Sequence, residues 1–193
     1  MENPPPVLLV HGLFGSAAVM KPMADRLRAR RPVESLDLRP SDGSVPIAEL
    51  GRRIDTAAAR FAALYRSTDV DLVGFSMGAL ACRWVVQRGE TPIRRFVSIS
   101  GPHMGTATAL FLNRAGIRDM RPGSPLLTEL AADPDPWKST RVFSFRTPFD
   151  LLIVPSTSSK LPQSRERTFA VPLHRWMPGD PRVTGAVAEA LDD

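Results

Sequence analysis

Apolar residues along the chain follow two patterns, short continuous runs and longer stretches with a three- or four-residue repeat. Continuous runs such as 7–10 predict strands covered on both faces, because a half-exposed strand would alternate apolar with polar. Residues 47–65 show the helical repeat. The predicted strands are 7–10, 33–38, 70–73, 95–99, 141–145 and 168–171, and the predicted helices are 17–30, 47–65, 77–87, 107–113, 125–132 and 182–191.

Strands that alternate with helices predict a three-layer α/β/α sandwich with a mostly parallel sheet of about six strands. The chain shows no repeat, low-complexity block or linker, so residues 1–193 are expected to form a single domain. In such sheets the ligand lies at the carboxyl ends of the strands. The candidate residues just past a predicted strand end are Leu13, Ser76, His103, Asp150 and His174.

The segment 71–78 reads Asp-Leu-Val-Gly-Phe-Ser-Met-Gly, with a strand pattern before Ser76 and a helix pattern after it. Gly74 and Gly78 have no Cβ, so strand and helix can approach closely while Ser76 stands clear of the sheet. A Gly-x-Ser-x-Gly motif alone arises by chance in roughly one chain in twenty of this length. Its position between strand and helix favours a nucleophile elbow over a flexible turn.

A serine hydroxyl needs an adjacent base to take its proton, and the base needs a third group to orient it. The chain has 3 histidines. Chain order favours His174 as the general base, because it follows the last predicted strand in a loop. His103 is the alternative base, and His11 is expected to brace the glycine-rich loop after the first strand.

The orienting acid should lie between Ser76 and His174 at a strand end. Asp150 is the first carboxylate after the predicted strand 141–145, between two apolar neighbours. A carboxylate in apolar surroundings needs a partner, which an imidazole would supply. The alternative role for Asp150 is an ordinary turn aspartate.

The tetrahedral intermediate of acyl transfer needs N–H donors where its oxyanion forms. Met77, at the amino end of the helix after Ser76, offers one backbone N–H, assisted by the helix dipole. Leu13, in the loop after the first strand, is expected to offer the second.

The formal net charge is +5, carried almost entirely by arginines that are scattered and not interleaved with aromatics. We therefore expect no nucleic-acid partner, while weak peripheral contact with an anionic lipid surface stays open.

The single cysteine, Cys82, excludes an internal disulfide. With no basic leader and no bilayer-length apolar run, the sequence predicts a cytoplasmic protein. No ligand cluster indicates a metal, and no organic cofactor is expected.

These segments resemble the α/β-hydrolase superfamily, and more narrowly the compact bacterial lipases and esterases related to class 2 lipases. Residues 7–15 resemble the first strand and oxyanion loop of that group, 71–79 its elbow and 100–106 its next strand end. Asp150 and His174 match its acid turn and terminal histidine segment. Phe75 departs from the group, which commonly carries histidine there.

The resemblance implies a minimal hydrolase fold without a large cap domain, in which 107–132 is a candidate partial cover over the site. It implies a serine carboxylic-ester hydrolase acting through an acyl-enzyme on small-molecule or lipid esters with short to medium acyl chains. The alternatives are a thioesterase, acyltransferase or amidase with the same triad, or a non-catalytic binding protein. The candidate pocket residues are Phe14, Phe75, His103, Met104 and Met177.

Overall fold

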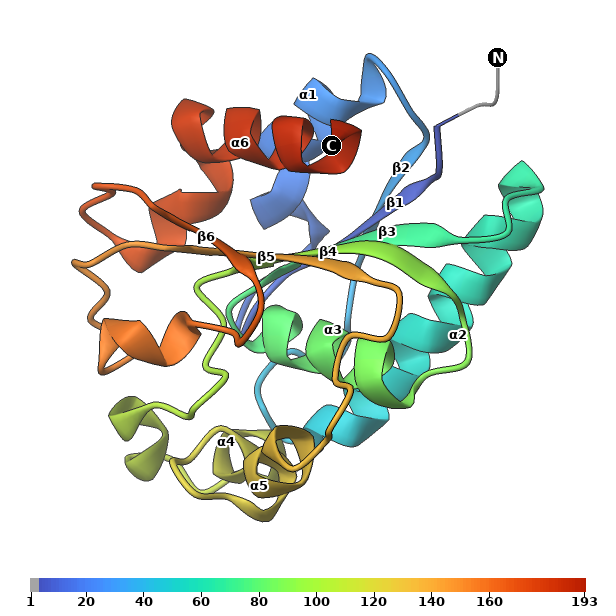
Figure 1. Ribbon diagram of the computed structural model, residues 1–193. Helices are drawn as coiled ribbons and strands as arrows, with labels where there is room; N and C mark the ends of the chain where they lie inside the picture. Colours follow the sequence, from blue (N-terminus) through green and yellow to red (C-terminus); the bar gives the residue numbers. More distant parts are fainter. Residues whose placement is uncertain (1–3) are drawn as a thin grey trace.

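The computed structural model describes residues 4–193 and shows a parallel sheet between two layers of helices (Figure 1). The expectation that the chain has no leader rests partly on residues 1–3, which lie outside the described part. The strands are β1 (Val7–Val10), β2 (Val33–Leu36), β3 (Val70–Phe75), β4 (Ile93–Ile99), β5 (Arg141–Arg146) and β6 (Arg165–Thr168). The α-helices are α1 (Lys21–Arg28), α2 (Ile47–Tyr65), α3 (Met77–Arg88), α4 (Ala115–Asp119), α5 (Pro125–Ala131) and α6 (Pro181–Asp192), and the 3-10 helices are η1 (Ala17–Met20), η2 (Ala107–Leu110), η3 (Ser156–Ser159) and η4 (His174–Gly179).

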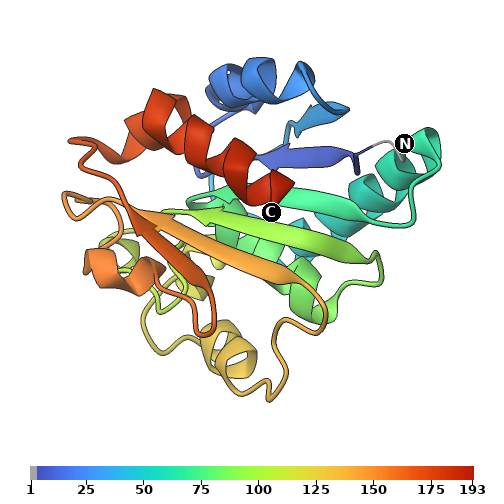
Figure 2. The same cartoon turned by 45° about the horizontal axis from the view of Figure 1, so that its top comes forward.

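The strand order is β2-β1-β3-β4-β5-β6, and each neighbouring pair is parallel. The predicted fold class is therefore confirmed, and no cap domain is present among the described residues. Because the strands are parallel, the carboxyl ends of all six lie on the same side of the sheet, which we call the carboxyl edge, and their amino ends lie on the opposite side, the amino edge (Figure 2). Loops from distant parts of the sequence are thereby brought to the same place.

The sheet is buried on both faces, as its continuous apolar runs predict. In β1, Val7 and Leu9 pack in the core under α1 and α6, whereas Leu8 and Val10 pack in the core under α2 and α3. All four are fully buried. Because side chains alternate across a strand, a run without polar interruption is what two helical layers require.

The prediction of the last strand was wrong in position. The expected strand 168–171 is displaced to Arg165–Thr168, all of whose residues are exposed. β6 is an outermost strand of the sheet, hydrogen-bonded only to β5. Charged side chains are usual on such edge strands because they discourage pairing with a further strand. The apolar Val171 follows the strand and packs in the core beneath α6. The apolar pattern therefore predicted a strand at the buried segment that follows β6, and not at β6 itself.

The segment 107–132 forms η2, α4 and α5 beside the α2–α3 layer (Figure 1). Leu126 and Leu127, which belong to this predicted cover segment, are buried in the core against that layer, as in ordinary helix packing. Leu110 and Phe111 in the same segment are exposed. The segment thus contributes packing through α5 and surface through η2.

Candidate active site

Ser76 lies at the corner between β3 and α3 in a strained backbone conformation, with φ 55° and ψ −125°. A non-glycine residue with such a φ is uncommon and persists only where the surroundings enforce it. The enforcing contacts are close backbone packing at the flanking glycines. A Cβ on Gly74 would lie 2.5 Å from the Ala79 Cα, and one on Gly78 would lie 2.3 Å from the His11 carbonyl oxygen. The two glycines permit the sharp turn that the sequence predicts.

The hydroxyl of Ser76 lies beside the loop after β1. A methyl group placed on Gly12 would lie 3.2 Å from Ser76 Oγ. His11 braces this loop: its Nε2 accepts the Leu38 N–H at 3.0 Å, so that Nδ1 donates to the Gly12 carbonyl at 2.9 Å. His11 is fully buried, which agrees with the bracing role expected for it.

The backbone N–H groups of Leu13, in the loop after β1, and of Met77, directly after Ser76, are the predicted oxyanion donors. Within residues 4–193, neither N–H group donates to a main-chain carbonyl, whereas the neighbouring Phe14 N–H donates to the Ser41 carbonyl at 2.7 Å. Met77 is the first residue of α3, where the N–H groups have no partner within the helix. Both amides are therefore without a main-chain partner in the described part of the chain, as a donor to a bound ligand atom would be.

Asp150 and His174 form a buried pair, with Asp150 Oδ2 2.7 Å from His174 Nδ1. The other carboxylate oxygen accepts the N–H groups of Leu152 at 3.0 Å and Ile153 at 2.8 Å. Burial acts to raise the pKa of Asp150, but the hydrogen bond and charge of His174 and these two amides outweigh it, so the pKa lies below its ordinary value. Asp150 is thus ionised and orients the imidazole.

His174 does not lie in an open loop, as the sequence suggested, but is the first residue of η4 and is buried. Its ring stacks on Phe75, with centroids 4.7 Å apart. The buried Nε2 atom of His174 has no hydrogen-bond partner among the described residues, so it does not bond the Ser76 hydroxyl in this structure. In sites without substrate, such bonds are often long and tighten only on binding.

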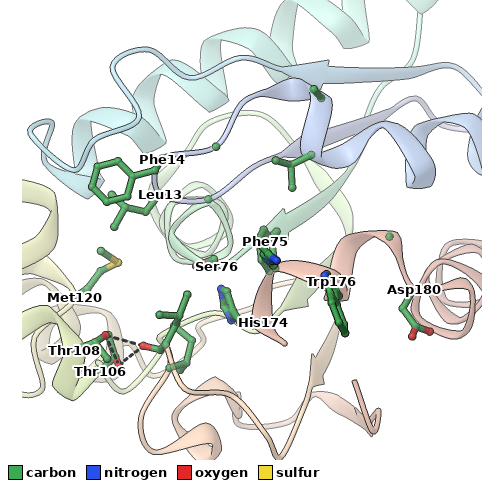
Figure 3. Close-up of a pocket in the computed structure, with 18 of the residues that line it drawn as sticks. Leu13, Phe14, Phe75, Ser76, Thr106, Thr108, Met120, His174, Trp176 and Asp180 are labelled. Carbon is green, nitrogen blue, oxygen red and sulfur yellow. Dashed lines mark hydrogen bonds between the residues drawn. The ribbon is translucent and has the colours of Figure 1, made fainter. Parts of the chain in front are cut away.

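Ser76 and His174 line one pocket of about 850 Å3, shown in Figure 3. Its wall is mainly apolar, as is usual for a small-molecule site. Phe14 and Phe75 belong to this wall, as predicted. Further wall residues that sequence analysis missed are Val19, Thr106, Thr108, Met120 and Trp176. Trp176 follows the predicted base by two residues, and this proximity was the available signal.

Three predicted pocket residues were placed wrongly, because none of them lines the pocket. His103 is buried, with Nε2 2.6 Å from Ser98 Oγ. Desolvation, and secondarily the charge of Arg83, hold the pKa of His103 well below its ordinary value. Met104 is exposed away from the pocket, and Met177 is fully buried beneath α6, since η4 turns its side chain inward.

The pocket wall and the acid turn are joined by hydrogen bonds. The hydroxyls of Thr106 and Thr108 each donate to the Leu152 carbonyl at 2.7 Å, drawn as dashed lines in Figure 3. Thr106 Oγ1 also accepts the Val154 N–H at 2.9 Å. These bonds fix the turn that carries Asp150 against the segment after β4.

No group of histidines, cysteines or carboxylates among the described residues could hold a metal ion. Cys82 is fully buried in α3, and desolvation raises its pKa far above the ordinary thiol value. It is therefore an inert packing residue. Nor is any helix in the described part long and apolar enough to cross a bilayer.

Comparisons with known proteins agree with this architecture. A family model described as palmitoyl protein thioesterase matches residues 6–144, which include Ser76 but end before Asp150. No curated protein matches the sequence. Among solved structures, the lin2722 gene product of Listeria innocua has a TM-score of 0.76 at 16% identity, covering 98% of this chain and 94% of that one.

Two further solved structures share the fold. The mature lipase BlEst2 of Bacillus licheniformis has a TM-score of 0.77 at 15% identity, covering 99% of this chain and 93% of that one. A pyrethroid hydrolase from Sphingobium faniae has a TM-score of 0.64 at 15% identity, covering 97% of each chain. At such identities the similarity concerns the fold alone.

Proposed function

Because the chain belongs to the palmitoyl protein thioesterase family of the α/β-hydrolases, we propose that it is a serine hydrolase that cleaves acyl esters through an acyl-enzyme. One observation carries the proposal. A strained serine at a strand-to-helix corner shares a pocket with a histidine whose far nitrogen, Nδ1, is held by a buried aspartate at 2.7 Å. A pocket that served only to bind a ligand would need neither the strain nor the buried hydrogen bond between Asp150 and His174.

In the proposed reaction Ser76 Oγ attacks the acyl carbon while its proton moves to His174 Nε2. The Leu13 and Met77 amides stabilise the resulting oxyanion. His174 then returns the proton to the leaving oxygen or sulfur, and the acyl group stays on Ser76. Water attacks this acyl-enzyme and gives a proton to His174. His174 passes that proton to Ser76 Oγ as the bond between Oγ and the acyl carbon breaks, which releases the carboxylic acid and restores the free serine.

The substrates we propose are esters with short- to medium-chain acyl groups, because the pocket is apolar and of about 850 Å3. Thioesters are the second candidate, favoured by the family model. The same triad also fits acyl transfer to another acceptor or amide cleavage, but no contact in the pocket favours these.

The test compares kcat/KM for paired oxygen esters and thioesters of increasing acyl length in the wild-type protein and Ser76→Ala. We expect a maximum at short to medium chains, and a loss of at least about 10³-fold in Ser76→Ala, because the nucleophile is removed. A consistently higher kcat/KM for the thioester would assign thioesterase activity. Equal turnover by both proteins would refute the proposed chemistry.

A further inference from the structure

Large apolar side chains that face solvent gather around the mouth of the pocket. Within residues 4–193, all of them except Leu64 and Tyr65 follow the carboxyl end of β1, β4, β5 or β6. We define the apolar rim as six aromatic and leucine side chains of this set, each at least half exposed: Phe14, Leu110, Phe111, Phe149, Leu151 and Trp176. Phe111 is 85% exposed and Leu151 is 76% exposed.

The rim is continuous with the pocket. Phe14 and Trp176 line the pocket themselves, and Phe111 and Leu151 are each followed by a lining residue, Leu112 and Leu152. Figure 3 shows Phe14 and Trp176 on opposite sides of Ser76. The rim therefore surrounds the opening through which a substrate enters.

Exposure of this kind requires an explanation, because soluble proteins rarely expose a contiguous apolar patch without a binding role. The side chains come from four separate loops, so no single packing constraint accounts for them. None belongs to either core cluster of the described residues. Polar residues at these positions would leave the core unchanged, which indicates that the rim serves an interaction.

The charges at this edge identify the partner. Asp42 pairs with Arg114 and Asp180 with Arg182, both at 2.8 Å, whereas Asp119 accepts the Ile47 N–H and pairs with no arginine among the described residues. In the described part of the chain, no carboxylate pairs with three other arginines on the loops around the rim, Arg118, Arg121 and Arg175. These three arginines outnumber the unpaired carboxylate of Asp119, so the net charge beside the rim is positive. Apolar side chains bordered by free arginines are complementary to a lipid surface that carries anionic headgroups.

We propose that the apolar rim docks on an anionic lipid surface, with Phe111 and Leu151 inserted at the level of the acyl chains. Arg118 and Arg175 then contact the headgroups. A second copy of the chain seated on the rim would close both pockets, whereas a lipid surface leaves the mouth open to an acyl chain. Docking goes beyond the proposed hydrolysis, since it does not require Ser76 to react.

The experiment measures flotation of the protein with vesicles of phosphatidylcholine containing phosphatidylglycerol. It uses the Ser76→Ala background, so that binding is separated from turnover. We expect Phe111→Asp with Leu151→Asp to weaken vesicle binding at least about tenfold, since two large apolar side chains no longer leave water. The matched control is Leu64→Asp, because Leu64 is 71% exposed at the far end of α2, away from the pocket. It should bind like the parent.

A second pair of variants tests the charges. Arg118→Gln with Arg175→Gln should lower binding to vesicles with phosphatidylglycerol severalfold and leave binding to pure phosphatidylcholine nearly unchanged. All substituted side chains are exposed, so the variants should fold, as thermal unfolding will verify. The proposal is overturned if the parent does not bind vesicles, or if the rim variant binds like Leu64→Asp. It is also overturned if light scattering without lipid detects a dimer of the parent protein and only a monomer of the rim variant.

Discussion

The two edges of the sheet differ in how they treat polar groups. At the amino edge, the buried carboxylate of Asp71 bonds Arg94 Nε at 3.0 Å and Arg31 Nη1 at 3.3 Å. Arg31 also bonds Asp192 and the Leu191 carbonyl, which ties the end of α6 to the sheet. The Asp71 carboxylate is thus satisfied within the protein and fixes β3 to its neighbours, while Nε and Nη1 of Arg95, its partner in register on β4, are buried without a hydrogen-bond partner among the described residues.

The carboxyl edge leaves comparable groups unsatisfied. Ser76 and Ser100 there have positive φ values of 55° and 49°, and His174 Nε2 is buried without a partner among the described residues. Apolar side chains face solvent around them. The comparison indicates that the amino edge stabilises the fold, whereas the carboxyl edge holds strain and unused bonding capacity for a ligand.

The largest effect expected at the carboxyl edge is that of Asp150→Asn. The amide would still fill the space, but it cannot stabilise the imidazolium or fix the tautomer of His174. We expect kcat/KM to fall about 10³- to 10⁴-fold, with only a small change in the melting temperature. Steady-state kinetics on a soluble ester with a melting curve will measure both. Activity within threefold of the wild type would break the assignment of this edge to chemistry.

The opposite result is expected from Asp71→Ala at the amino edge. Arg31 and Arg94 would then face each other without their shared carboxylate, and we expect the free energy of unfolding to fall by about 3 kcal/mol. kcat/KM at 25 °C should stay unchanged. Denaturant titration and kinetics on the same preparation test this. A protein of normal stability with impaired turnover would reverse the comparison.

His103 sharpens the comparison, because it lies at the carboxyl edge but outside the pocket. Its pKa is held well below 6.5 by burial, so the unfolded chain binds a proton that the folded chain does not. Stability should therefore fall as pH drops below about 6.5, and the contribution of His103 is about 1.4 kcal/mol per pH unit.

The measurement for His103 is the free energy of unfolding between pH 7 and pH 5, compared between the wild type and His103→Gln. The difference between the two proteins should change with pH in favour of the variant, while both still hydrolyse ester at pH 7. A pH-independent difference would contradict this, because it would show that His103 has the same pKa in the folded and the unfolded chain.

The sequence predicted most of the fold because its signals are local. The strand at 7–10 and the helix at 47–65 were predicted with the bounds that the structure shows, since their apolar patterns match two buried faces and one buried face respectively. β6 was predicted three residues too late, because an edge strand needs no apolar residues and the apolar signal lies after it. Local hydrophobicity therefore predicts elements that lie between two layers better than elements at the margin.

The candidate site was only partly predictable. Ser76, Asp150 and His174 follow strand ends, and a parallel sheet brings such positions together whatever the loops do. The pocket wall depends on how the loops fold back, so Thr106, Met120 and Trp176 were missed. The reactivity of the three candidates stays a prediction.

The most direct test of the central claim is labelling with a fluorophosphonate followed by peptide mass spectrometry. The account predicts one adduct per chain on Ser76 in the wild-type protein, and a rate at least about 10³-fold slower in His174→Ala, because the hydroxyl then has no base. A folded wild-type protein that stays unlabelled at Ser76, or labelling at the same rate in His174→Ala, would contradict it.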